Sequence, residues 1–300
     1  MSNLRIGTRR SPLALAQAEE IRVRLEATGV IAEIVPMSTS GDEGATADTS
    51  PQGLKGLWID TILDALEAGE IDLAVHSAKD LPADEGDGFT IAAVPEREDP
   101  ADVLICRDAA SLRPGALIGT SSLRRRAQLL AGFPGLEVVD LRGNVGTRLR
   151  KVADGEVDAA VLAAAGLARL GLEPAHSKPL PLAMMVPAPG QGCLAVQTRD
   201  DDADAMAAVS PLDHAPSHRA LDAERSLMWR LGGGCALPFG AYATVGDETI
   251  TLAAVIASPD GATLLRVETR GATPEDAAAV AAKELIAEGA ERILAEAAAG

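Results

Sequence analysis

The sequence predicts an α/β protein of three domains, and three observations carry that prediction. In the first two thirds of the chain, short β-branched runs alternate with helical patterns, which is typical of βαβ units and largely parallel sheets. Two proline-bearing segments, 95–100 and 179–189, bracket the second of two such blocks. From about Pro211 the pattern changes to a helix, three strands and a long alanine-rich helix, which is typical of an α+β domain.

The first block begins with a strand at 4–6. Ser11 and Pro12 then begin a helix, because a hydroxyl accepts unpaired N–H groups of the first turn and proline fixes φ at the first helical position; Gly29 ends it. A strand at 32–37, a helix over 57–68 that ends at Gly69, and a strand at 72–76 follow. Residues 38–56 show neither the helical nor the strand periodicity of apolar residues. So long an irregular segment in a compact domain is typical of a lid or binding loop.

The second block predicts strands at 103–106, 117–119, 137–141 and 158–162, with helices beginning at Ser121, Asn144 and Ala163. The last region predicts a helix over 213–231, strands at 241–245, 249–257 and 263–268, and a helix from Pro274. We therefore expect a first lobe of residues 1–96 with 190–212, a second lobe of 97–189, and a C-terminal domain of 213–300. Two chain crossings between lobes form a hinge, beside a cleft that can close on a ligand.

Composition excludes several classes of function. The 300 residues carry 27 basic and 44 acidic side chains, a formal charge of −17, which argues against nucleic acid and membrane surfaces as partners. Neither a signal peptide nor a membrane span is apparent. Three cysteines without a C-x-x-C pair argue against disulfide scaffolds and against a structural metal, and favour a reducing cytoplasmic compartment.

Basic residues concentrate in one part of this acidic chain. Segment 124–151 holds seven Arg and Lys against two acidic residues. Charge counting alone also allows an ordinary solvated face. Three strand-to-helix turns, 7–11, 119–125 and 142–148, combine small residues, hydroxyl or amide groups and a guanidinium. A helix N-terminus attracts anions and arginine fits a carboxylate, so the turns predict an anion site at the strand ends. Without a Walker pattern, a ligand with several carboxylates is favoured over a nucleotide.

Three further motifs are ambiguous by themselves. Residues 190–195 fit the letters of a dinucleotide fingerprint but open no helix, so a hinge entering a strand is favoured. Asp80, in the segment HSAKDLP, is either a turn residue or a carboxylate facing the cleft. Cys235 follows three glycines and is either a small buried apolar residue or a mobile exposed thiol.

Eight segments in order resemble the porphobilinogen deaminase (hydroxymethylbilane synthase) family along essentially the whole chain. They are residues 5–15, 55–57, 76–82, 119–125, 141–149, 165–171, 189–192 and 233–238. The resemblance implies two periplasmic-binding-protein-like lobes with mixed sheets around a cleft, plus a C-terminal α+β domain. It implies a transferase of tetrapyrrole biosynthesis that joins four porphobilinogen molecules head to tail, with loss of ammonia, to give hydroxymethylbilane.

The resemblance also implies how the site is equipped. A dipyrromethane cofactor would be held by a thioether on Cys235, Asp80 would be the catalytic carboxylate, and the enzyme would act as a cytoplasmic monomer without a metal. The residues that would bind cofactor and substrate are Arg9, Ser11, Lys55, Trp58, Lys79, Thr120, Ser121, Ser122, Arg124, Arg125, Arg142, Gly143, Asn144, Arg148, Arg169 and Gln191. Those that would bind the acetate and propionate arms are Arg9, Ser11, Lys79, Ser122, Arg124, Arg125, Arg142, Arg148 and Arg169.

At two positions the sequence differs from the family pattern, which limits how far residue roles of the family can be assigned to this chain. The family usually has Phe at the position of Trp58 and commonly a basic residue near Asp60, so contacts with the cofactor can differ there. A second interpretation from another class stays open: a non-catalytic, two-lobed anion-binding protein would explain the hinge and the arginine-bearing turns without any role for Asp80 or Cys235.

Overall fold

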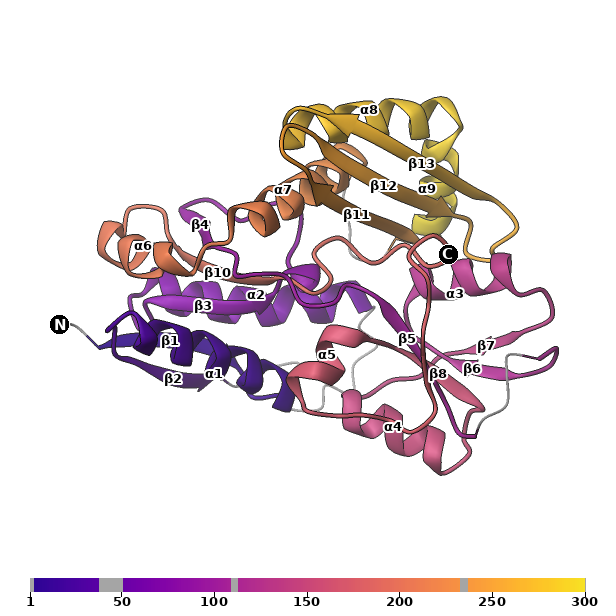
Figure 1. Cartoon of the computed structure of the whole chain (residues 1–300), viewed down its shortest axis with the longest axis horizontal. Helices are drawn as coiled ribbons and strands as arrows, with labels where there is room; N and C mark the ends of the chain where they lie inside the picture. Colours follow the sequence, from indigo (N-terminus) through magenta and orange to yellow (C-terminus); the bar gives the residue numbers. More distant parts are fainter. Residues whose placement is uncertain (1–2, 38–50, 109–112, 233–236, 300) are drawn as a thin grey trace. The chain divides into compact units, whose positions relative to one another are not determined.

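A computed structural model describes residues 3–37, 51–108, 113–232 and 237–299, with only the backbone for 51–58 and 298–299 (Figure 1). The chain forms two compact units, and each is built from two separate stretches of sequence. Unit 1 comprises Met1–Arg97 and Cys193–Arg219, and unit 2 comprises Glu98–Gly192 and Ala220–Gly300. The predicted boundaries of three domains around a cleft stay a prediction.

Unit 1 contains a mixed five-stranded sheet of order β2-β1-β3-β10-β4. Its strands pair in parallel from β2 through β1 to β3, and antiparallel from β3 through β10 to β4. The elements are β1 (Leu4–Arg9), α1 (Pro12–Ala27), β2 (Ala32–Met37), α2 (Pro51–Glu67), β3 (Leu73–Ser77), the 3₁₀ helix η1 (Ala78–Asp80), β4 (Phe89–Ala93), β10 (Leu194–Arg199), α6 (Ala203–Val209) and η2 (Ser210–Leu212).

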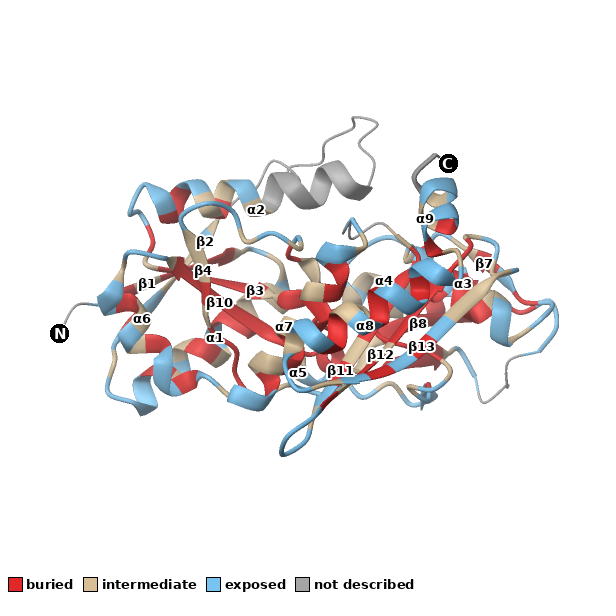
Figure 2. Cartoon of the chain, turned by 90° about the horizontal axis from the view of Figure 1, so that it is seen from above, coloured by how far each residue is buried: buried red, intermediate tan, exposed pale blue. Residues whose placement is uncertain are grey.

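Helices α1 and α2 cover opposite faces of this sheet. Successive side chains of a strand point to opposite faces. Leu73 and Val75 of β3 pack in the cluster that contains Ile21 of α1, whereas Ala74 packs in the cluster that contains Ile62 of α2. Figure 2 shows the largely buried strands β3 and β10 between α2 on one side and α1 on the other. The sheet is therefore held from both sides, which fixes its loops at the strand ends.

The second sheet, in unit 2, repeats the mixed pattern in the order β7-β6-β8-β5-β9. The pairs β7/β6 and β6/β8 are parallel, and β8/β5 and β5/β9 are antiparallel. Its elements are β5 (Asp102–Cys106), β6 (Leu117–Gly119), α3 (Leu123–Gly132), β7 (Glu137–Val139), α4 (Val145–Ala153), β8 (Ala159–Ala163), α5 (Ala164–Arg169) and β9 (Ser177–Pro179).

Unit 2 also contains an antiparallel sheet, β11-β12-β13. Helix α7 (Ala215–Arg230) leads to β11 (Phe239–Val245), β12 (Ile250–Ala257) and β13 (Leu264–Gly271), and α8 (Pro274–Ala287) and α9 (Ala290–Ala299) follow. Helix α8 packs on β12 and β13 through Ala277, Ala281 and Leu285, all fully buried. This part has the α+β pattern that the sequence predicts.

The structure confirms the α/β class and corrects four details. The sheets are mixed, as the family resemblance implies, and not largely parallel, as the alternation of strands and helices predicts, because β5 and β10 enter them antiparallel. Helix α2 begins at Pro51, six residues before the predicted start, and residues 38–50 of the predicted loop lie outside the described part. The C-terminal tract is two helices, since Gly289 adopts φ 98° between them. Strands β4 and β9 and helix α6 were not predicted.

The described residues lack two further kinds of feature. None of their helices is both long and apolar enough to cross a membrane. The same residues contain no group of three or more His, Cys, Asp or Glu side chains placed to hold a metal ion.

Candidate active site

A pocket lies in unit 1 at the carboxyl ends of β1 and β3. These strands pair in parallel, so their ends meet at one edge of the sheet. Arg9 ends β1, Ser77 ends β3, and η1 follows β3 at once with Lys79 and Asp80. Ser11 caps α1 beside them, accepting a hydrogen bond from the Ala14 N–H at 3.3 Å, as predicted. The sequence thus delivers a guanidinium, two hydroxyls and a carboxylate to one place.

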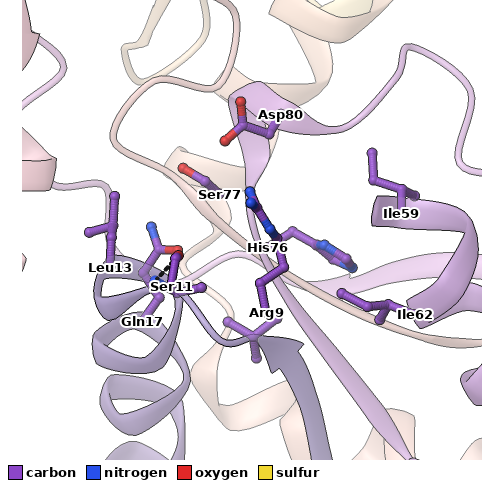
Figure 3. Close-up of a pocket in the computed structure, with 11 residues that line it drawn as sticks. Arg9, Ser11, Leu13, Gln17, Ile59, Ile62, His76, Ser77 and Asp80 are labelled. Carbon is purple, nitrogen blue, oxygen red and sulfur yellow. Dashed lines mark hydrogen bonds between the residues drawn. The ribbon is translucent and has the colours of Figure 1, made fainter. Parts of the chain in front are cut away.

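The pocket combines a polar rim with an apolar wall. Leu13 of α1, Ile59 and Ile62 of α2, and Val75 of β3 supply the apolar surface. Figure 3 shows the Arg9 side chain extending from the end of β1 toward the turn that carries Ser77 and Asp80. An apolar wall facing opposite charges suits a flat heteroaromatic ring that bears carboxylate groups.

His76 is the buried titratable residue of this pocket. Its side chain is 8% exposed, and its ring lies toward Ile59 and Ile62 of α2 (Figure 3). Burial lowers the pKa of His76 to about 4, Asp80 opposes the shift, and the positive charge of Arg9 adds to it. Its Nε2 has no hydrogen-bond partner in the part of the chain that the structure describes. The imidazole is therefore neutral at pH 7 and leaves the charges of Arg9 and Asp80 to dominate the pocket.

The other two predicted turns lie side by side in unit 2. They follow β6 and β7, which pair in parallel. Ser122 caps α3, accepting from the Arg125 N–H at 3.4 Å, and its own N–H donates to Thr120 Oγ1 at 3.2 Å. Ser121 Oγ donates to the Leu141 carbonyl at 2.8 Å and so links the two turns. The cap is Ser122, one residue after the predicted helix start.

The turn after β7 holds two accessible cations. Gly143 adopts φ 118°, and an added Cβ would lie 2.7 Å from the Thr147 side chain, so this position requires glycine. Asn144 caps α4, accepting from the Thr147 N–H at 2.9 Å. Arg142 is exposed and donates through Nε to Asp140 at 2.7 Å, and Arg148 Nε donates to the Gly143 carbonyl at 2.7 Å. The exposed guanidinium of Arg142 has N–H groups left for a ligand.

Arg124 and Arg125 differ from the other predicted cations because both are buried. Their guanidiniums pair with Asp102, the first residue of β5, whose side chain is fully buried. The positive charges of Arg124 and Arg125 outweigh the effect of burial and hold the pKa of Asp102 far below its usual range. Gln191 donates to the same carboxylate at 3.0 Å. The nearby Arg169 donates to the Gly192 carbonyl at 3.1 Å.

The structure thus brings the predicted residues together in two groups, one in each unit. In unit 1, Arg9, Ser11 and Asp80 line one pocket, and Lys79 precedes Asp80 in η1. The remaining described residues of the prediction are in unit 2. That the two groups meet in one cleft stays a prediction. Cys235 lies outside the described residues, and so do the side chains of Lys55 and Trp58.

Sequence reasoning missed two residues of these groups. His76 was part of a quoted motif but received no role, and only its burial distinguishes it. Asp102 was not considered, although a carboxylate at the first position of an otherwise apolar strand is an unusual pattern. Such a residue needs a buried partner, and that requirement is the signal that could have identified it.

Comparisons with known proteins show which family the chain resembles. The family model "Porphobilinogen deaminase, dipyromethane cofactor binding domain" matches residues 4–207, and "Porphobilinogen deaminase, C-terminal domain" matches residues 219–287. The porphobilinogen deaminase of Brevibacillus brevis is 43% identical over 302 residues, covering 99% of this chain and 98% of that protein. The porphobilinogen deaminase of Chromobacterium violaceum is 45% identical over 304 residues, covering 98% of each.

A solved periplasmic substrate-binding protein of an ABC transporter from Coxiella burnetii is 17% identical, with a TM-score of 0.43, covering 74% of this chain and 96% of that one. That likeness is too low to carry an argument. The family matches and the relatives, by contrast, cover nearly every residue. The chain belongs to the porphobilinogen deaminase family.

Proposed function

We propose that this chain joins four porphobilinogen molecules head to tail, with release of ammonia, to give hydroxymethylbilane. Membership of the family gives the class of reaction. The observation that carries the proposal to particular residues is the pocket at the ends of β1 and β3, where Asp80 and Arg9 share one rim. In this proposal Asp80 is the catalytic carboxylate.

Each condensation makes one carbon–carbon bond. The aminomethyl carbon of one porphobilinogen loses its nitrogen as ammonia, and the free α-carbon of another pyrrole attacks that carbon and then loses a proton. Positive charge develops on the pyrrole as ammonia leaves. A carboxylate fixed beside an apolar wall stabilises such charge and accepts the proton that the attacking carbon loses. Asp80 has that environment, because Ile59, Ile62 and Val75 line the same pocket.

Arg9, Arg142 and Arg148 have a different task in this proposal. Porphobilinogen carries an acetate and a propionate, and a guanidinium binds a carboxylate through two parallel hydrogen bonds. Arg9 lies on the pocket rim, Arg142 presents N–H groups at the turn after β7, and Arg148 lies in the first turn of α4 beside it. His76, with a pKa of about 4, is uncharged at neutral pH and adds no positive charge beside Arg9.

The residues present also fit a dipyrromethane cofactor, whose two pyrroles carry four carboxylates. Arg124 and Arg125 bring two positive charges to the single negative charge of Asp102, and Arg124 Nε is buried without a partner in the described chain. Such a cluster suits an anionic ligand. When bound, a dipyrromethane supplies the pyrrole carbon from which the product chain grows. We propose that Arg124 holds one of its carboxylates, together with Ser122 at the start of α3, and that Cys235 forms the thioether. Arg125 and Gln191, which donate to Asp102 and to backbone carbonyls, keep this part of the site in place.

Intact mass of the purified protein tests the proposal. We expect a mass above that of the sequence by two pyrrole units, with the excess absent from Cys235→Ser and retained by Cys106→Ser. Cys106 serves as the cysteine control because it is a partly buried free thiol in the described part of the chain. Porphobilinogen turnover should release one ammonia for each molecule consumed. A protein of sequence mass that binds porphobilinogen without releasing ammonia would be a binding protein instead.

We further propose a cytoplasmic monomer. The cysteine pattern, which holds no C-x-x-C pair, supports a reducing compartment. Arg9, Ser11 and Asp80 line one pocket within a single chain. Sedimentation of the cofactor-loaded protein tests the oligomeric state, and a concentration-dependent dimer would contradict it.

A further inference from the structure

Asp102 is at the centre of a buried polar cluster in unit 2. Its Oδ2 accepts from Arg124 Nη1 at 2.7 Å, and its Oδ1 accepts from Arg125 Nε at 2.9 Å and Nη2 at 2.7 Å. Gln191 Nε2 donates to the same Oδ1 at 3.0 Å. All three donors belong to the residues predicted to bind cofactor and substrate, whereas Asp102, being an anion, repels a carboxylate. Its contribution to binding must therefore act through its neighbours.

The cluster is fixed by backbone carbonyls as well. Arg124 Nη1 also donates to the Val186 carbonyl at 2.7 Å, and Arg125 Nη1 donates to the Val161 carbonyl at 2.9 Å. Gln191 Nε2 reaches the Pro100 carbonyl at 2.6 Å. Each of the three side chains is thus held by Asp102 on one side and by the backbone on another, which leaves it little freedom to rotate.

The two arginines are used differently. Arg125 presents the edge formed by Nε and Nη2 to Asp102, which is the edge that grips a carboxylate in two parallel bonds. Both side-chain hydrogen bonds of Arg124 instead use Nη1. Its Nε is buried and has no partner among the residues that the structure describes. The carboxylate-binding edge of Arg124 is therefore kept for another group.

Folding stability alone does not account for this arrangement. Two guanidiniums against one carboxylate leave an excess positive charge in a buried place, and burying charges costs more than a packed apolar cluster of similar volume would. A buried N–H without an acceptor adds to that cost. Both costs are recovered when a ligand carboxylate arrives and supplies the missing negative charge and acceptor.

We propose that Asp102 is a positioning residue, which orients Arg124 so that its Nε–Nη2 edge receives a carboxylate of the cofactor or of the growing product, and which fixes Arg125 and Gln191 beside it. The inference rests on the proposed function for the identity of the ligand. Asp102 itself contacts neither the ligand nor the reacting atoms.

Three variants of the holoenzyme test the role. Asp102→Asn removes the charge, Asp102→Glu keeps the charge but moves the carboxylate by one methylene group, and Asp158→Asn is the control. Asp158 precedes β8 at the opposite end of the β5–β8 pair and forms a partly exposed ion pair with Arg107 at 3.4 Å. The measurements are Tm, the fraction of protein that carries the cofactor mass, and KM and kcat of the cofactor-loaded fraction.

We expect Asp102→Glu to stay folded, with KM raised or the cofactor-loaded fraction lowered by about tenfold or more, the size of one lost charge-assisted contact. Asp158→Asn should leave both unchanged. If Asp102→Asn does not fold, because two buried guanidiniums lose their counter-charge, Asp102→Glu decides alone. A lower Tm with unchanged KM and unchanged cofactor loading would mean a purely structural role and would overturn the inference.

A double-variant experiment tests whether Asp102 acts through Arg124. If Asp102 acts by orienting Arg124, then Asp102→Glu should change KM and cofactor loading far less in an Arg124→Gln background than in the wild type. Additive effects would overturn the inference. If wild-type protein carries no added mass and releases no ammonia, it is the proposed function that fails, whatever the variants show.

Discussion

Removal of His76 gives the sharpest quantitative prediction, because its environment has a measurable consequence. The ring is buried in the pocket of unit 1, and burial is the largest cause of its low pKa. Arg9 lowers the pKa further and Asp80 raises it. The folded protein therefore resists protonation of His76 at pH values where an unfolded chain accepts the proton readily.

The magnitude follows from the two pKa values. An ordinary histidine has a pKa of 6.5 and His76 has one of about 4, a difference worth about 3 kcal/mol at 1.36 kcal/mol per pH unit. As pH falls below 6.5, the unfolded chain gains a proton that the folded chain does not, so the free energy of unfolding decreases. The decrease is complete near pH 4, where the folded protein also becomes protonated.

His76→Gln removes the titrating group and so removes this pH dependence. The difference in unfolding free energy between wild type and His76→Gln should change by about 3 kcal/mol between pH 6.5 and pH 4, with wild type losing more. Denaturant unfolding followed by circular dichroism measures it, because the other titrating groups cancel in the difference. In NMR spectra of the wild type, the His76 ring signal is identified by its absence from His76→Gln. That signal should not titrate until the pH approaches about 4. A midpoint near 6.5, or parallel stability curves, would refute the reasoning.

Three other substitutions test other parts of the site. Asp80→Asn should keep the fold and the cofactor mass but lower kcat by about a hundredfold or more, since it removes the proton acceptor; a near-normal kcat would exclude Asp80 from catalysis. Arg142→Leu should change the unfolding free energy by less than about 1 kcal/mol, because its pair with Asp140 is exposed, yet raise KM about tenfold to a hundredfold; a normal yield of product would contradict it. Ser122→Ala should cost about 1 kcal/mol of stability by removing the cap of α3, and Ser122→Gly only a few tenths; equal losses would mean that the cap is not the cause.

Local features of the fold were predictable because short-range interactions determine them. Ser11 and Asn144 cap α1 and α4 as expected, since a capping side chain bonds an N–H group only three residues away. The strand at 32–37 also has its predicted bounds, because the local sequence indicates them. The direction of a strand depends instead on contacts far along the chain. Strand β10 returns to unit 1 after almost a hundred residues in unit 2, and periodicity does not record that it runs antiparallel.

The candidate site was predicted in the same uneven way. Its turn residues could be found because a guanidinium and hydroxyls at a helix start are visible in the sequence. The partners of the cations could not, since Asp102 precedes Arg124 by 22 residues and meets it only when β5 and α3 pack together. Arg124 and Arg125 therefore looked alike in the sequence, whereas the structure gives them different roles.

Comparison with other arginines of the chain strengthens that distinction. Arg5 and Arg22 each grip a carboxylate with Nε and Nη2, of Asp72 and Glu19 respectively, as Arg125 grips Asp102. With 44 acidic residues for 27 basic ones, an arginine of this chain has many potential partners. The buried Arg124 nevertheless keeps its Nε unpartnered within the described chain, because Asp102 and the Val186 carbonyl hold its other end. Arg5, Arg22 and Arg125 thus pair with carboxylates of the chain by that edge, whereas the hydrogen bonds of Arg124 leave the same edge for a carboxylate from outside the chain.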